Sequence, residues 1–175
     1  MTPLQIFLAY VKMRGITPKL YKMALDTRMI YSYNEISNKY ERRHLRFCDV
    51  FEDHFKVYGF GGCLFTNLTY QYPYGGEIMR DPDVYYAAKR WNDFMGRNIV
   101  YDGNLKVGSH IKYLSWGGTY EGTVESISRD FSRIRLTTGV GRTWTTNIGK
   151  ITEVDGKPLD LSFHFKWKGK EYGKK

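Results

Sequence analysis

The stretch that decides the fold of the second half of the chain is KVGSHIKYLSWGGTYEGTVESISRDFSRIRL, residues 106–136. Apolar and polar residues alternate along it, and glycines interrupt the alternation in two places. Because neighbouring residues of a β-strand face opposite sides of the sheet, this period of two predicts strands with one buried face. The predicted inward residues are Ile111, Tyr113, Val124, Ile127, Ile134 and Leu136, and the predicted outward residues are Lys112, Thr123, Glu125, Arg133 and Arg135.

Short strands of the same kind continue beyond this stretch. Turn signals in WGG, SRD and TTGVG separate candidate strands at 109–116, 119–128, 131–138, 142–147 and 150–154. Five short strands with tight turns predict a small closed β-barrel.

The N-terminal region carries helix signals instead. Thr2 is a candidate N-cap with Pro3 at the first helical position, and Gly15 ends the segment. Thr17 and Pro18 repeat this signal at once, so we expect a pair of short helices.

More helices are expected before residue 103. The chain predicts a third helix at 34–41, and residues 45–60 fit a helix in part and a strand in part. Asp81 and Pro82 open a last helix over DPDVYYAAKRWNDFMGRN. The sequence therefore predicts an α+β protein.

Three regions are expected along the chain. They are a mainly helical N-terminal domain at 1–103, a β-barrel at 104–160 and a basic aromatic tail at 161–175.

The composition favours a polyanionic partner. The 175 residues are 42% hydrophobic, which suffices for a buried core, and 17% aromatic. The formal net charge is +9, and most of the excess lies beyond residue 103, where 13 lysines and arginines face 7 acids. An excess of cations in an aromatic-rich chain suggests nucleic acid before a small anionic substrate.

Two groups of residues are candidates for contact with nucleic acid. The barrel supplies a cationic face, and the tail FHFKWKGKEYGKK alternates lysines with aromatics that could stack on bases. The candidates are Lys112, Arg133, Arg135, Arg142, Lys150, Lys166, Trp167, Lys168, Lys170, Lys174 and Lys175.

Simpler explanations stand beside these. The barrel cations can form a solvated face paired with Glu121, Glu125 or Asp130, and the tail can be a disordered solubilising end or an edge strand. Trp116 and Trp144 can stack on bases, but the sequence favours the core for both.

The tyrosines of TYQYPYGG alternate beside a turn. They can form an exposed aromatic surface for a protein partner, and packing against the helices is the favoured alternative.

Nothing in the sequence indicates catalysis or a bound cofactor. Its four histidines are scattered, without metal-ligand spacing, and YGFGG and GGTYEG lack the context of a nucleotide-binding loop. Cys48 and Cys63 are expected to be buried thiols of a cytoplasmic protein. We expect neither an enzyme nor a metal site, and no membrane segment.

The β region resembles the KOW motif of SH3-like barrels. In that motif a glycine precedes a strand, a glycine-containing turn follows, and a second glycine stands two residues before an inward valine. The corresponding residues here are Gly108, Ile111, Tyr113, Gly118, Gly122, Val124 and Ile127, and SWGG departs from the pattern by placing Trp116 in the turn. The resemblance implies a C-terminal KOW or SH3-like barrel, a fold that binds RNA, DNA, ribosomal or transcription partners.

The layout as a whole is similar to the MotB-type early proteins of T-even phages. This resemblance implies a nucleoid-associated protein in the host cytoplasm that modulates host chromatin or gene expression. Together, the residues and the resemblance predict non-catalytic binding of double-stranded DNA with little sequence preference, with RNA as the other nucleic-acid ligand. The alternative is a protein-interaction module that inhibits or redirects a host enzyme such as RNA polymerase or a nuclease; an enzyme acting on nucleic acid is third.

Overall fold

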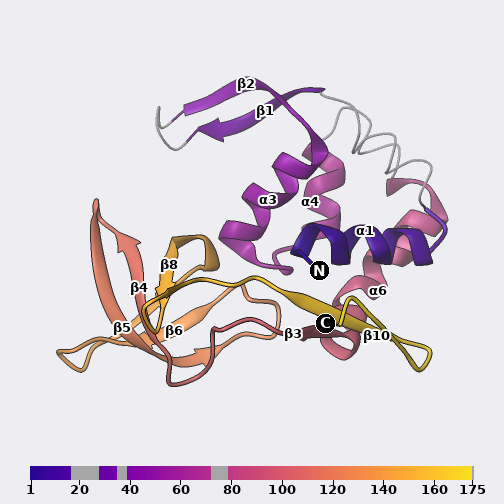
Figure 1. The fold of residues 1–175 in the computed structure, drawn as a ribbon. Coiled ribbons are helices and arrows are strands. Elements are labelled where there is room, and N and C mark those ends of the chain that lie inside the picture. Colours follow the sequence, from indigo (N-terminus) through magenta and orange to yellow (C-terminus); the bar gives the residue numbers. More distant parts are fainter. Residues whose placement is uncertain (17–27, 35–38, 72–78, 175) are drawn as a thin grey trace.

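The structure is a computed structural model that describes residues 1–16, 28–34, 39–71 and 79–174. It contains helices and antiparallel sheets, so the α+β class is confirmed (Figure 1). The helices are α1 (Pro3–Met13), α3 (Phe47–Tyr58), α4 (Leu64–Gln71) and α6 (Pro82–Asn98), with a 3₁₀ turn η1 (Ile148–Lys150). The strands are β1 (Arg28–Asn34), β2 (Lys39–Leu45), β3 (Ile99–Tyr101), β4 (His110–Ser115), β5 (Gly118–Ile127), β6 (Ile134–Thr137), β7 (Thr143–Thr146), β8 (Ile151–Val154), β9 (Lys157–Pro158), β10 (Phe163–Trp167) and β11 (Lys170–Tyr172).

The predicted caps of the first and last helices are confirmed. At α1 the Gln5 amide donates to the Thr2 hydroxyl, and the Thr2 amide donates to the Gln5 side chain, a reciprocal capping box. At α6 the Asp81 carboxylate accepts from the amide of Asp83. The helix expected to begin at Thr17 lies outside the described residues.

The structure corrects the helix expected at 34–41 and decides the ambiguous segment after residue 45. The helix expected at 34–41 is wrong, because β1 and β2 form an antiparallel hairpin in which Asn34 pairs with Lys39. The tyrosines of RMIYSYN alternate with polar residues, and that period favours a strand over a helix. The ambiguous segment after residue 45 is the helix α3, which ends at Gly59 with φ of 59°.

The predicted strands beyond residue 108 are confirmed, but the closed barrel is not. Six strands form one sheet in the order β7-β6-β5-β4-β8-β9. The sheet is open because its end strands β7 and β9 do not pair with each other in the described structure. Between β7 and β8 the chain passes through η1, which contacts α3. Of the predicted inward residues, Ile127 is half-buried and the others are buried.

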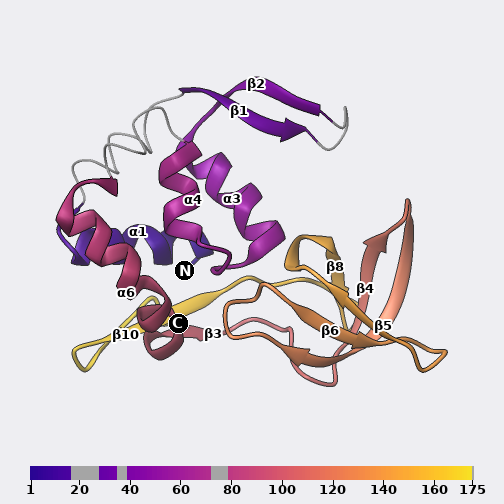
Figure 2. The ribbon, with the colours of Figure 1, turned by 180° about the vertical axis from the view of Figure 1, so that it is seen from behind.

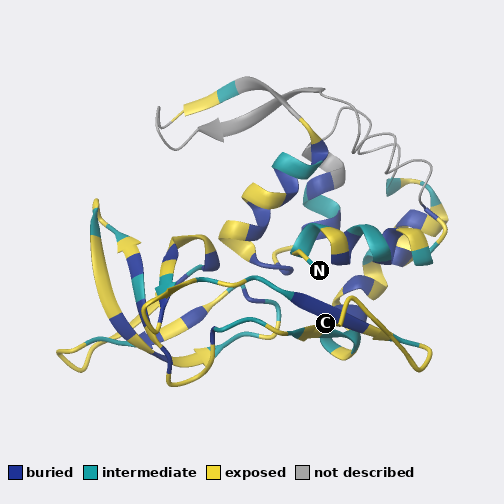
Figure 3. Ribbon diagram, in the orientation of Figure 1, coloured by how far each residue is buried: buried dark blue, intermediate teal, exposed yellow. Residues whose placement is uncertain are grey.

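The end of the chain is part of the core rather than a separate tail. β10 is the central strand of a second sheet, β11-β10-β3, and Phe163 and Phe165 are buried in it (Figure 3). Figures 1 and 2 show this strand passing beneath α1 and beside the lower end of α6. A single cluster of buried residues runs from α1 to β10, so the boundary expected at residue 103 does not divide the core.

A tight seam joins the helices to the six-stranded sheet. Gly59 and Gly61 lie against the β5–β6 turn so closely that a Cβ on Gly59 would lie 2.1 Å from the carbonyl oxygen of Asp130. The Phe60 amide donates to that same oxygen at 2.7 Å. The glycines of YGFGG therefore allow the backbone after α3 to lie close to the β5–β6 turn. No helix in the described ranges is both long and apolar enough to cross a membrane.

Candidate nucleic-acid interface

A polar groove lies at this seam. Its first part, with a volume of about 480 Å³, is lined by the end of α3, the β5–β6 turn, β7 and η1. A second part of about 430 Å³ continues along β5, β6 and β7, and the two parts share Arg133 and Thr145. The groove is therefore a continuous depression across the sheet edge.

The chemistry of the groove suits an anion. Arg133 and Lys150 are exposed on its walls, and neither forms an ion pair within the described part of the chain. Hydroxyl and amide groups surround these cations, and none of the described lining residues is acidic. The neutral polar lining residues are Ser126, Ser128, Ser132, Thr143, Thr145, Thr146 and Asn147. An arginine fork, an ammonium and neutral donors are the groups that bind phosphate oxygens.

Asp130 fixes the turn that presents Arg133. Its carboxylate accepts from the hydroxyl of Ser128 at 2.9 Å, and from the amide and hydroxyl of Ser132 at 3.0 and 2.6 Å. Burial opposes ionisation of Asp130, but these hydrogen bonds outweigh it and hold the pKa of the carboxyl below its ordinary value. The Arg133 amide donates to the Ser128 hydroxyl at 2.9 Å, so the backbone that carries Arg133 is anchored to the same network.

Other predicted cations of the sheet have local partners. Lys112 Nζ lies 3.2 Å from Glu153 Oε2, and Arg135 Nε lies 3.2 Å from Glu125 Oε2. Arg135 still lines the second part of the groove, where its guanidinium is paired with Glu125. Arg142 is exposed in the β6–β7 turn, outside the groove lining.

The lysines of the C-terminal segment lie elsewhere. Figures 1 and 2 show the β10–β11 hairpin at the opposite end of the molecule from β5 and β6. Lys166 and Lys174 both pair with Glu171, at 3.3 and 3.1 Å, while Lys168 and Lys170 are exposed in the hairpin. Lys175 lies outside the described residues. The structure therefore does not bring the two predicted cationic groups together.

The tryptophans differ from the predictions. Trp167, expected to stack on a base, packs against Phe94 at 5.6 Å between ring centroids and beneath the guanidinium of Arg14 at 5.2 Å. Trp116 and Trp144, expected in the core, are 89% and 44% exposed. Each lies where the sheet has no second layer to cover it: Trp116 in the β4–β5 turn, and Trp144 on the edge strand β7.

Part of the groove has no signal in the sequence. Tyr58 lines it and is 49% exposed, and Gly62 and Asn147 complete the wall. Tyr58 is separated from β7 by more than eighty residues, and no local pattern connects them. The serines and threonines of SISRDFS and TWTT were visible, but their direction depends on the strand pairing.

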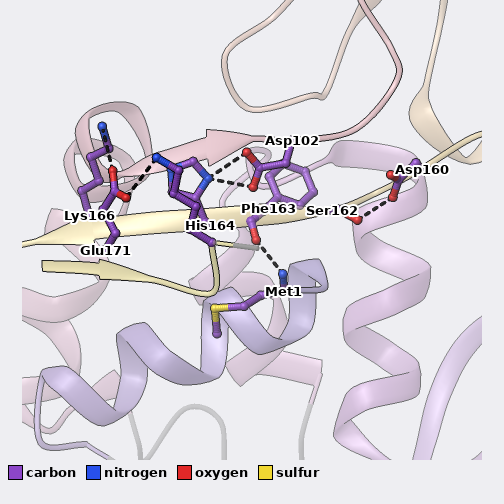
Figure 4. Close-up of polar contacts among 9 residues, drawn as sticks. Met1, Asp102, Asp160, Ser162, Phe163, His164, Lys166 and Glu171 are labelled. Carbon is purple, nitrogen blue, oxygen red and sulfur yellow. Dashed lines mark hydrogen bonds and ion pairs between the residues drawn. The ribbon is translucent and has the colours of Figure 1, made fainter.

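His164 on β10 pairs with Asp102, the residue after β3 (Figure 4). His164 Nδ1 lies 2.8 and 2.7 Å from the two carboxylate oxygens of Asp102, and the His164 side chain is 6% exposed. Its Nε2 is buried and has no hydrogen-bond partner in the described structure. The contact between His164 Nδ1 and the Asp102 carboxylate links β10 to the segment after β3.

The remaining reactive side chains form no cluster. Cys48 and Cys63 are free thiols; Cys48 is half-buried and Cys63 is exposed, so the expectation of two buried thiols is wrong. Among the residues described, no three histidine, cysteine or carboxylate side chains come together as metal ligands. Comparison of the chain with protein-family models, curated proteins and solved structures finds no match.

Proposed function

We propose that the protein binds double-stranded DNA without catalysis and with little sequence preference, through the groove at the seam. The observation that carries the proposal is the pair Arg133 and Lys150, two cations that form no ion pair with the described residues, in a groove whose described lining has no acid. Phosphodiesters would be held by these cations and by the surrounding hydroxyl groups.

Low sequence preference follows from the same chemistry. Phosphate contacts position a protein on DNA but do not identify bases. The groove is walled by a sheet edge and the end of α3, so no helix projects from it in the way that a recognition helix enters the major groove.

The finer fold assignment is also a proposal. The antiparallel order β7-β6-β5-β4-β8 and the glycine positions support a KOW or SH3-like sheet. Gly108 has φ of 90°, a conformation that favours glycine. A Cβ on Gly122 would lie 3.3 Å from the Thr137 carbonyl oxygen, so the neighbouring strand lies close to this glycine. A role as a phage early protein acting on host chromatin rests on the sequence resemblance alone.

One observation favours the protein-interaction alternative. β7 is an edge strand that pairs only with β6 in the described structure, and its sequence TWTT has no charge to discourage pairing with another strand. A partner strand added there would use hydrogen bonds and apolar contacts, so its affinity would depend weakly on salt.

Fluorescence anisotropy with labelled nucleic acids tests the proposal. We expect unrelated duplexes to bind with similar affinity, and the logarithm of affinity to fall linearly with the logarithm of salt concentration. Single-stranded DNA and RNA of equal length are the comparison ligands. Absence of duplex binding at low salt, or a strong preference for one duplex in a site selection, would overturn the proposal.

A further inference from the structure

The turn of the β4–β5 hairpin contains a residue, Trp116, that the turn conformation does not favour. Ser115 pairs with Gly118, so Trp116 and Gly117 form a two-residue turn with φ of 49° and 75°. Positive φ at both central positions belongs to the type I′ turn, which favours asparagine, aspartate and glycine at these positions. A tryptophan at the first position is therefore a poor choice for the turn itself.

Burial does not explain this tryptophan either. Trp116 is 89% exposed, the highest value among the large apolar side chains of the described residues. In the described structure its side chain has no hydrogen bond, ion pair or ring contact. Leu114 and Tyr120 beside it are each 48% exposed. A residue that breaks local rules without a gain in packing marks a functional position.

The surroundings of Trp116 indicate what it would contact. The segment Leu114–Tyr120 contains no charged residue, whereas the groove on the same sheet carries the unpaired cations. A surface with an uncharged aromatic tip and a cationic groove complements DNA, which has uncharged base pairs inside and phosphates outside. Gly117 has open space around its Cβ position, so the turn can approach a ligand closely.

The two regions are close enough to reach one DNA molecule. Ser128, which pairs with Arg133, is ten residues from Gly118 along β5 and the turn after it, so the strand separates the groove from the tip by at most about 33 Å. One turn of B-form DNA is about 34 Å long. Figure 1 shows the β4–β5 hairpin curving away from the other strands, as an arm that can reach past the body of the sheet.

We propose that Trp116 is a wedge that enters between base pairs of the duplex held by the groove and unstacks one base step. The inference rests on the proposed DNA binding and adds a contact with bases to it. Apolar side chains that enter a duplex in this way act from the minor groove and kink the DNA, so the bound duplex is expected to be bent.

The test uses the full chain and a short duplex that contains 2-aminopurine, a base whose fluorescence rises when it is unstacked. A separate label reports binding by anisotropy. Wild-type protein should raise the 2-aminopurine signal as it binds, and W116F should retain most of the rise. W116N should abolish it and weaken binding about tenfold, the effect of one lost stacking contact. W144A, which removes the other exposed tryptophan of the sheet, should keep the rise.

Folding and phosphate contact are controlled within the same series. Asparagine suits the type I′ turn, so W116N should melt at the wild-type temperature or above it. Its salt slope should equal that of the wild type, because no phosphate contact is removed. Duplex binding without a rise in signal, or a rise that persists in W116N, would overturn the wedge and leave the proposed DNA binding intact. No duplex binding by the wild type would overturn both.

Discussion

Replacing Arg133 and Lys150 together tests the groove directly. Both side chains are exposed and lack ion pairs among the described residues, so R133A/K150A should change the free energy of unfolding by less than about 1 kcal/mol. If each cation neutralises one phosphate, the slope of log affinity against log salt becomes shallower by about 0.9 for each, or about 1.8 for the double variant.

A matched control separates local contact from net charge. Lys112 and Lys166 pair with Glu153 and Glu171 at 3.2 and 3.3 Å, and neither lines the groove. K112A/K166A removes the same two charges from the chain. Because these lysines make no phosphate contact in the proposed complex, the slope of this variant should stay within about 0.5 of the wild-type value.

Anisotropy titrations at four or five salt concentrations give the three slopes, and thermal melting shows that each variant is folded. An unchanged slope in R133A/K150A at an unchanged melting temperature would remove the groove from the DNA site. Equal changes in the two double variants would show that only the total charge matters.

Three further results are expected. G59A should lower the free energy of unfolding by more than about 3 kcal/mol in urea titrations, because its Cβ would lie 2.1 Å from a backbone oxygen. The control G15A, at φ of 72° with nothing within 4 Å of the new Cβ, should lower it by only about 1 kcal/mol. Equal losses in the two variants would contradict the tight seam. Burial lowers the pKa of His54, so below about pH 6.5 the unfolded chain binds more protons than the folded chain. The melting temperature should therefore fall as the pH drops below about 6.5, and it should fall less steeply in H54N. A melting temperature that rises over this range would contradict the expectation. A fragment of residues 104–175 should not fold, because it lacks β3 and the helices that cover Phe163; cooperative melting of the fragment followed by circular dichroism would show otherwise.

The sequence predicted what depends on neighbours along the chain. The caps at Thr2 and Asp81 and the alternation from Ile111 to Leu136 are local signals, and the structure confirms them. The alternation FHFKW indicated a strand as one alternative, but not its partner β3, which lies about sixty residues earlier. Strand pairing at that distance is fixed by the shared core, which no local pattern reveals.

The candidate site was predicted only where it depends on local alternation. Alternation placed Arg133 and Arg135 outward, and both are exposed. Only the strand register shows that Arg135 lies beside Glu125 while Arg133 faces a groove. The opposite wall, with Tyr58, comes from α3, so the groove exists only after the seam has formed.

The pairing of the first residue with β10 has a consequence for folding during synthesis. The Met1 ammonium donates to the Phe163 carbonyl oxygen at 2.5 Å, the Phe163 amide donates back to the Met1 carbonyl oxygen at 2.9 Å, and 162 positions separate the two residues. At ribosomal rates of 5–20 residues per second, α1 waits roughly 8 to 30 s before its partner strand is made. The part of α1 that contacts β10 stays uncovered during this interval. Rare codons placed between α1 and β10 would lengthen the exposure and lower the yield of native protein.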